Sequence, residues 1–415
     1  MKKIAYCAVP ESGGLFRFYQ NLRKALEPLG WELVAPSAGL SVAKRWDESF
    51  ADKTCHLLVP DETDPKKCSE ALANWLKEHE VSILIPMDDS IAANALPHMD
   101  SGIKLVTRCS TVSDFGFRIC LLCPERLSRI VVMTPAQEKR MLNYDGAEGK
   151  VTVIPHGVDV QEAGSIEHQP APDQSGGLAG RVDSGEESPR LFKVVYIGRL
   201  EDRSKGILFL PAIALRLKEK GIDFRMDVIG DGIDRERLEY KLEELEIEDK
   251  VELVGSLAKE ALTERITAEG YDALILPSRY EGFPNALLEG MAAGMVPVVS
   301  DLDGIGGFII ENGVEGFLCE IGNPIAFASA LGKIAQDPKL RQEMADKARA
   351  AVDSRFSLKR MGEDYDRLFS EVLDEKAVYE PRPWSEYEIN KNYRQSWRRF
   401  IPTWAKNYIR RYIRI

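Results

Sequence analysis

The sequence has little of what marks a membrane-spanning or a secreted protein. Its apolar stretches, such as Ala273–Pro277, have the length of a strand and fall far below the roughly 20 residues that cross a bilayer. No apolar core of a signal peptide follows Met1–Tyr6, so we expect no secretory leader. The seven cysteines are odd in number and scattered, which favours a reducing compartment over a disulfide scaffold. We therefore expect a cytoplasmic protein.

Short apolar segments alternate with amphipathic helical ones along most of the 415 residues, a length that exceeds one typical core. This alternation predicts an α/β fold with two doubly wound, Rossmann-like domains that face each other across a cleft. In the first domain, residues 1–160, the expected strands are 3–9, 32–35, 82–85, 104–107, 129–133 and 151–154. In the second, residues 191–355, they are 193–199, 225–229, 251–254, 273–276, 296–300 and 316–319.

Two segments interrupt this alternation. Residues 161–190 are rich in Gln, Ser, Gly, Pro, Asp and Glu without an apolar period, which is typical of a flexible polar linker. Residues 376–415 form a basic, aromatic tail. Its last 25 residues hold eight Lys or Arg and no acid, so the other 390 residues carry −19 although the whole chain has a net charge of −11.

The end of this tail has the pattern of an amphipathic helix over residues 402–415. Trp404, Tyr408 and Tyr412 recur on one face, while the cations gather on another. Interfacial aromatics with cations favour an anionic membrane surface, so we expect a peripheral position at an inner membrane face. The alternative is packing on the acidic body or on a partner subunit. A tail this short on an acidic protein argues against nucleic acid as a partner.

The run from Glu281 to Glu289 is the most informative part of the chain. It follows an apolar strand and enters a helix of small residues, a junction where an α/β fold holds an anion. Carboxylates accept hydrogen bonds from paired hydroxyls, so Glu289 suits a ribose and Glu281 the hydroxyls of a transferred group. In the alternative interpretation, Glu281 caps the helix and Glu289 is solvated. Phosphates would meet the backbone of the residues between them: Gly282, Phe283, Pro284, Asn285, Ala286 and Leu287.

Other strand ends carry cations and glycines. Arg199 follows Gly198 at the end of one strand, and Lys205 precedes the next helix, so both cations can converge on a diphosphate. The alternative is two surface cations in a loop. Backbone groups at further strand ends either line the same ligand or form plain turns. They belong to Gly13, Gly14, Gly230, Val254 and Leu257.

Together the motifs of the second domain, within about residues 150–375, resemble those of the retaining nucleotide-sugar glycosyltransferases of family 4, which have the GT-B fold. The first domain matches more loosely, through Gly13 and Gly14. The resemblance implies that Arg199 and Lys205 hold the donor diphosphate, while Glu281 contacts the sugar and Glu289 the ribose. It implies transfer of a sugar to an acceptor hydroxyl with retention of anomeric configuration, in polysaccharide, glycolipid or other glycan synthesis. It also implies that residues 356–375 form a helix that crosses back to the first domain.

The first domain departs from the family pattern. A catalytic-site histidine usually follows a strand like 104–107, but the loop there reads Thr107-Arg108-Cys109-Ser110 and holds none of the five histidines. Cys109 stands near the expected place. Candidates for the acceptor side of the cleft are therefore Asp88, Asp89 and Cys109. His156 is expected to line the hinge between the domains.

We expect neither a metal nor a cofactor, because Arg199 and Lys205 already neutralise a diphosphate. The partners would be a nucleotide-sugar donor and a glycan or lipid-linked acceptor. Two functions of other classes remain open. One is a non-catalytic, glycosyltransferase-like binding protein, which the missing histidine suggests. The other is a nucleotide-sugar epimerase of the same fold.

Overall fold

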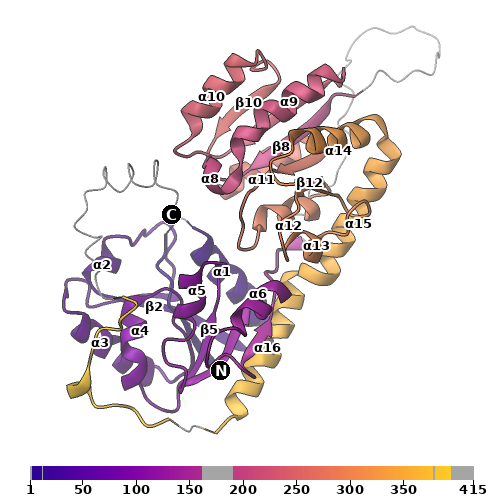
Figure 1. The fold of residues 1–415 in the computed structure, drawn as a ribbon. Coiled ribbons are helices and arrows are strands. Elements are labelled where there is room, and N and C mark those ends of the chain that lie inside the picture. Colours follow the sequence, from indigo (N-terminus) through magenta and orange to yellow (C-terminus); the bar gives the residue numbers. More distant parts are fainter. Residues whose placement is uncertain (1, 12, 161–189, 377–378, 394–415) are drawn as a thin grey trace.

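The computed structural model describes residues 2–11, 13–160, 190–376 and 379–393, and these form two α/β lobes (Figure 1). The first lobe holds a sheet in the order β3-β2-β1-β4-β5-β6-β7, and the second a sheet in the order β10-β9-β8-β11-β12-β13. Every pairing between these strands is parallel. The expected fold class, with two doubly wound α/β domains, is confirmed.

The first lobe contains the strands β1 (Lys2–Tyr6), β2 (Trp31–Ala38), β3 (Cys55–Leu58), β4 (Val81–Ile85), β5 (Lys104–Arg108), β6 (Leu127–Val132) and β7 (Val151–Val153). Its α-helices are α1 (Gly14–Leu26), α2 (Leu40–Ala43), α3 (Pro65–Glu78), α4 (Ser90–Ala95), α5 (Asp114–Ile119) and α6 (Pro135–Met141).

The second lobe contains the strands β8 (Phe192–Ile197), β9 (Phe224–Ile229), β10 (Val251–Gly255), β11 (Ala273–Leu276), β12 (Val296–Ser300) and β13 (Phe317–Cys319). Its α-helices are α8 (Asp202–Lys205), α9 (Leu210–Glu219), α10 (Arg235–Glu244), α11 (Lys259–Glu269), α12 (Asn285–Ala292), α13 (Gly306–Ile309), α14 (Pro324–Gln336) and α15 (Pro338–Phe356). Helix α16 (Leu358–Asp374) follows α15.

The expected strands are all present, with ends shifted by a few residues, but β3 was not expected. None of its four residues is fully buried, because β3 lies at the edge of the first sheet. A short, half-exposed segment of this kind has neither the apolar run of a buried strand nor a clear alternation. β3 was therefore missed because its sequence has no recognisable hydrophobic pattern, and its presence leaves the fold class unchanged.

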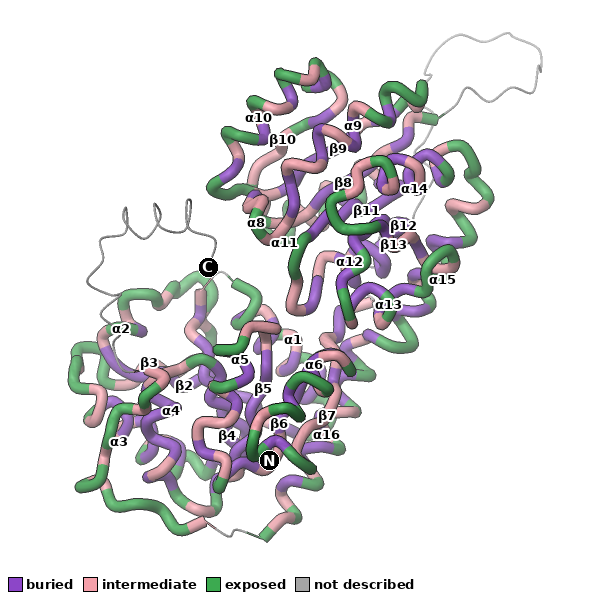
Figure 2. The backbone as a smooth tube through the Cα atoms, in the orientation of Figure 1, coloured by how far each residue is buried: buried purple, intermediate pink, exposed green. Residues whose placement is uncertain are grey.

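In each sheet the strand order reverses at one strand. In the first sheet β1 lies between β2 and β4, and in the second β8 lies between β9 and β11. The connections on the two sides of such a strand diverge, so a crevice opens at the carboxyl ends of the strands. The central strands are largely buried while the helices around them have exposed faces (Figure 2). The loops that follow β1, β8 and β11 are thus the natural places for a ligand.

The chain passes between the lobes at two places that bond to each other. Val158 donates its N–H to the Phe356 carbonyl at 2.9 Å, and Leu358 donates its N–H to the Val158 carbonyl at 2.9 Å. Gly157 lies so close to the second crossing that a Cβ there would be 2.7 Å from the Ser357 carbonyl oxygen. Helix α16 then runs back along the first lobe, where it packs on α1 (Figure 1).

Residues 379–393 lie on the first lobe after α16 ends. The Trp384 ring stacks on His98 with 4.6 Å between ring centroids. Further along, the Tyr393 hydroxyl donates to Asp88 Oδ1 at 3.1 Å. The region predicted as a tail therefore begins with a docked segment.

Other parts of the predicted linker and tail lie outside the described residues. This holds for residues 161–189 of the linker and for residues 394–415. The proposed membrane-binding stretch, 402–415, is among them.

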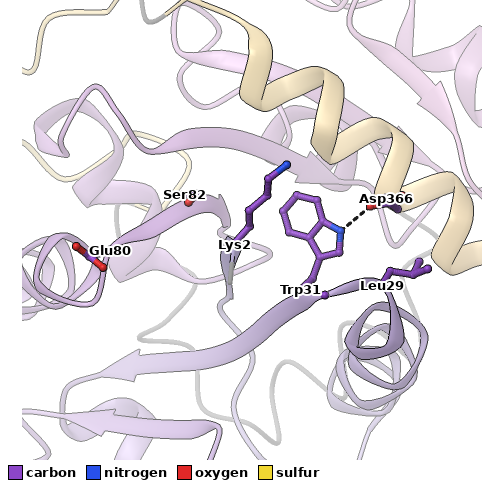
Figure 3. A pocket seen from close by; sticks show the side chains of 7 residues that line it. Lys2, Leu29, Trp31, Glu80, Ser82 and Asp366 are labelled. Atoms are coloured by element: carbon purple, nitrogen blue, oxygen red, sulfur yellow. Dashed lines mark hydrogen bonds between the residues drawn. The ribbon is translucent and has the colours of Figure 1, made fainter.

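A cavity of about 540 Å³ lies at the amino ends of β1, β2 and β4, the opposite end of the sheet from the crevice (Figure 3). Trp31 forms one wall, and its indole Nε1 donates to Asp366 Oδ1 of α16 at 2.7 Å. The Lys2 ammonium lies 5.2 Å from the Trp31 ring centroid. Because ligands of this architecture bind at the carboxyl ends, we assign the cavity to the seam between α16 and the sheet.

The seam between α16 and α1 yields a stability prediction. A Cβ at Gly362 would lie 2.6 Å from the Ala25 carbonyl oxygen, and backbone cannot move aside as a side chain can. We expect Gly362→Ala to lower the free energy of unfolding by about 1–3 kcal/mol, measured by urea denaturation. The matched control is Gly307→Ala, where a Cβ would meet no atom within 4 Å. Equal urea midpoints for the two variants would contradict the close contact.

Candidate functional site

The loops that follow β8, β9 and β11 approach one another too closely to admit side chains. A Cβ on Gly230 would lie 1.9 Å from the Gly198 carbonyl oxygen. Gly206 has a φ of 62°, and a Cβ there would lie 2.1 Å from the Pro277 carbonyl oxygen. Only glycine accepts both this backbone conformation and this proximity. These residues therefore bring three strand ends together into one surface.

Lys205 and Glu281 form an ion pair on this surface. The Lys205 ammonium lies 2.7 Å from one carboxylate oxygen of Glu281 and 2.8 Å from the other. The Ser278 hydroxyl donates to the same carboxylate at 2.8 Å. Both charged side chains are largely buried, with 21% and 11% of their surface exposed. Lys205 ends α8 and Glu281 follows β11, so two motifs far apart in the sequence meet in one contact.

Arg199 lies near this pair but is not part of it. The residue is exposed, and its guanidinium makes no hydrogen bond or ion pair with any other described residue. Its carbonyl oxygen accepts a hydrogen bond from the Tyr196 hydroxyl at 2.8 Å, which holds the backbone of the loop. A cation that is exposed and without a carboxylate partner retains its full capacity to bind an anion.

Helix α12 points its amino end at the same region. It begins at Asn285 after the N-cap residue Pro284, and no side chain caps it. Its first N–H groups and the positive end of the helix dipole therefore favour an anion. The preceding loop reaches the first lobe, since a Cβ on Gly282 would lie 3.1 Å from the Ser110 carbonyl oxygen. Among the other predicted residues of this run, Phe283 and Leu287 are buried.

Glu289, which lies within α12, is paired with a residue of the other lobe. Its carboxylate lies 2.7 Å from the guanidinium of Arg17, which belongs to α1. The Glu289 side chain is 25% exposed and that of Arg17 38%, so solvent reaches the pair and another partner can replace either residue at low cost. The structure thus gives the expected ribose-binding carboxylate a partner that was not predicted.

A small cavity of about 70 Å³ opens beside this pair, between α1, α11 and α12. Arg17, Glu289 and Thr263 are among its lining residues. Val254 and Leu257, at the end of β10, do not line it and instead pack against the core of the second lobe. Glu289 therefore lines this cavity, whereas these two residues do not.

His156 joins the two lobes. Its Nδ1 lies 2.6 Å from Asn285 Oδ1, and its Nε2 accepts a hydrogen bond from Arg108 at the end of β5. The ring lies between Phe18, at 4.9 Å, and Phe283, at 5.0 Å between centroids. Burial and the positive charge of Arg108 lower the pKa of His156 to about 3, so the imidazole is neutral.

The first lobe has a cavity of about 510 Å³ at the carboxyl ends of β1 and β4. The loop with Gly13 and Gly14 forms one side, and Asp88 forms another. Arg45 and Glu11, which make an ion pair, also line it. The cavity therefore offers both carboxylate acceptors and one guanidinium to a ligand.

Of the predicted acceptor-side residues, Asp88 and Asp89 line this cavity and Cys109 does not. Asp88 lines the cavity, and desolvation by the protein around it raises the pKa of its carboxyl. Asp89 lines the same cavity but caps α4, accepting from the N–H of Ile91 at 2.7 Å and of Ala92 at 2.9 Å. Burial raises the pKa of Asp89 as well. Cys109 is 1% exposed and turns its thiol to the Thr111 carbonyl at 3.0 Å, so it offers nothing to a ligand.

Three residues of this region were missed by reasoning from the sequence: Arg17, Arg108 and Tyr393. Each lies outside a glycine-rich or acidic motif, and each acquires its partner from a distant part of the chain. The only sequence signal was the place of Arg108 directly after an expected strand. The residue predicted as functional in that loop was its neighbour Cys109.

Within the part of the chain that the structure describes, no three His, Cys, Asp or Glu side chains gather closely enough to hold a metal ion. Among the same residues, no helix is long and apolar enough to cross a membrane.

Residues 183–351 match the family model described as glycosyl transferases group 1. One curated relative is the alpha-D-kanosaminyltransferase of Streptomyces kanamyceticus, 28% identical over 179 residues, or 43% of this chain and 45% of that protein. Another is the lipopolysaccharide 1,6-galactosyltransferase of Escherichia coli K12, 25% identical over 319 residues, or 73% and 77%. The chain spans about half the length of several curated relatives that it matches.

A solved structure with the same fold is that of a glycosyltransferase from Rickettsia africae ESF-5. It superposes with a TM-score of 0.68 at 18% identity and covers 90% of this chain and 99% of that one. At this identity the likeness concerns the fold, which is the two-domain GT-B arrangement expected from the motifs.

The neutral imidazole of His156 predicts how stability depends on pH. The unfolded chain binds a proton there near pH 6.5, whereas the folded chain does so only near pH 3. The free energy of unfolding should therefore fall as the pH drops below 6.5, by roughly 1–2 kcal/mol at pH 5 from this residue.

Replacing His156→Gln should flatten this slope between pH 6.5 and 5 in urea denaturation. The control His79→Gln, at an exposed histidine, should keep it. A His156→Gln slope equal to that of the unaltered protein would contradict a buried neutral ring.

Proposed function

We infer that this chain, whose residues 183–351 belong to the glycosyl transferases group 1, transfers a sugar from a nucleotide-sugar to an acceptor hydroxyl. The observation that carries this proposal is the contact of Lys205 with Glu281 beside Arg199 and the amino end of α12. Two cations and a helix N-terminus converge where the diphosphate of a donor would lie. A carboxylate stands next to them for sugar hydroxyls.

Each residue has a distinct role in the proposed reaction. Arg199 and Lys205 stabilise the diphosphate as negative charge develops on the departing oxygen. Glu281 holds Lys205 in place and accepts hydrogen bonds from the donor sugar. Glu289 accepts hydrogen bonds from the ribose after Arg17 gives way, because both compete for one carboxylate.

We propose that the sugar keeps its anomeric configuration. The bond from the anomeric carbon to the diphosphate oxygen breaks, and the acceptor oxygen bonds to the same face of the sugar. The acceptor proton passes to the departing diphosphate. Glu281 is a poor nucleophile for a covalent intermediate, because hydrogen bonds from Lys205 and Ser278 stabilise its negative charge. A carboxylate has about four acceptor sites, so it can still accept from sugar hydroxyls. No metal is required in this scheme, since the cations of the chain neutralise the diphosphate.

The acceptor would enter from the first lobe. The cavity beside Asp88 faces the crevice with hydrogen-bond acceptors suited to sugar hydroxyls. We propose a glycan or lipid-linked acceptor, in line with the lipopolysaccharide named for the Escherichia coli relative. Domain closure over the two substrates would exclude water and so limit donor hydrolysis.

The test is release of nucleoside diphosphate from a panel of UDP-, GDP- and ADP-sugars, with and without acceptor glycans. Acceptor-dependent release is expected with one donor. An epimerase would change the donor sugar without an acceptor, and a binding protein would release nothing. Either of these outcomes would overturn the proposal.

With that donor, Lys205→Ala and Arg199→Ala should each lower kcat by roughly 100- to 1,000-fold, because each removes charge stabilisation in the transition state. Glu289→Ala should instead raise the donor KM. The matched control is Arg203→Ala, which removes an exposed cation from the same short helix. A Lys205→Ala variant as active as the control would contradict the assigned role.

For the tail we propose peripheral binding to an anionic membrane at the cytoplasmic side. Each cation near such a surface contributes about 1 kcal/mol at low salt. The full-length chain should co-sediment with vesicles containing phosphatidylserine, and a chain ending at Tyr393 should not. Neutral phosphatidylcholine vesicles are the control. Equal sedimentation of the two chains with anionic vesicles would exclude the tail as the anchor.

A further inference from the structure

Arg108 is a buried cation without a carboxylate partner among the described residues. Only 4% of its surface is exposed, and its guanidinium carbon lies 3.6 Å from the ring centroid of Phe18. Its NH2 group reaches Met133 Sδ at 3.5 Å and donates to His156, while its Nε has no hydrogen-bond partner. Burying an unpaired charge costs several kcal/mol, and an apolar side chain of similar size would be more stable there. The position therefore calls for an explanation other than packing.

The chemistry of arginine determines which nitrogen of His156 carries the proton. Guanidinium can only donate, so His156 Nε2 must accept from Arg108. A neutral imidazole has one N–H, which must then be on Nδ1. Nδ1 lies 2.6 Å from Asn285 Oδ1 and donates to it. The three residues thus form a chain of hydrogen bonds that runs in one direction, from Arg108 through His156 to Asn285.

This chain determines the orientation of the Asn285 amide. Its oxygen is used by His156, so its nitrogen, with two N–H donors, is left for another partner. No described residue accepts a hydrogen bond from that nitrogen. Asn285 is the first residue of α12, whose amino end has no side-chain cap. An amide nitrogen at this place adds donors to those of the helix backbone.

We propose that Arg108 and His156 are positioning residues that hold the Asn285 amide with its N–H groups toward the donor diphosphate. The proposal rests on the proposed function and assigns a further residue to it. Arg108 and Asn285 belong to different lobes, so the diphosphate contact is complete only when the end of β5 is docked against α12. The first lobe thereby controls the affinity of the second lobe for the donor.

The decisive variants are Asn285→Ala, which removes the donors, and His156→Phe, which keeps the ring between its aromatic neighbours but breaks the chain. Each should raise the Kd for the nucleoside diphosphate by roughly 10- to 100-fold, measured by calorimetry on the full chain. The double variant should bind no more weakly than either single one, because both remove the same contact.

Two further variants separate positioning from stability. Arg108→Lys should weaken nucleotide binding and also lower the urea midpoint. The control Arg126→Lys alters another buried arginine, which donates to backbone carbonyls far from the site. It should lower the midpoint and leave the nucleotide Kd unchanged.

The outcomes distinguish this proposal from the proposed function. If the unaltered chain binds no nucleoside diphosphate, the proposed function fails. If it binds and Lys205→Ala weakens binding, but Asn285→Ala does not, only the positioning role is overturned. Additive losses in the double variant would overturn it as well.

Discussion

The reciprocal hydrogen bonds of Val158 with Phe356 and Leu358 determine how the two sheets face each other. Without these hydrogen bonds, each of the two connections between the lobes would be a single segment of backbone that could rotate freely. With them, the crossings form one seam, and residues on either side can meet at fixed places. The contact of Arg17 with Glu289 and that of His156 with Asn285 both depend on this alignment.

Lys205 and Arg199, the two candidate diphosphate-binding cations of the second lobe, differ in how far a carboxylate neutralises each of them. Lys205 is held by both oxygens of Glu281 and has little freedom, whereas Arg199 is exposed and retains its hydration. The Lys205 side chain is already held in place, so it loses little conformational entropy when a ligand binds. The Arg199 side chain, in contrast, loses conformational entropy when it binds a ligand. An anion that binds here therefore meets one fixed and one adaptable charge.

Much of the fold could be predicted because buried parallel strands are continuous apolar runs, and Ala273–Leu276 is one of them. The glycines of the second lobe were also recognisable, since close backbone approach restricts residue type there. The two glutamates stood out by their spacing after an apolar strand, and their roles stay predictions. Partners across the lobes were not predictable. Arg17 is one polar residue among several on α1, and only the relative placement of the lobes brings it to Glu289.

The first lobe was harder to anticipate for a similar reason. Arg108 is buried by Phe18 from α1 and lies next to Tyr365 from α16, so its surroundings come from segments that are remote in the sequence. Cys109 follows it and turns into the core. Residues 379–393 were assigned to the basic, aromatic tail, yet Trp384 of this segment stacks on His98 of the first lobe, a contact that no sequence pattern indicated.

The packing of α16 on α1 has a consequence for how the protein is made. Trp31 bonds to Asp366, so the first lobe to leave the ribosome cannot complete its structure until α16 has been synthesised. The second lobe, whose last helix α15 ends at Phe356, is finished earlier. During synthesis the apolar face of α1 must therefore wait, exposed or guarded by a chaperone, for a helix encoded far downstream of it.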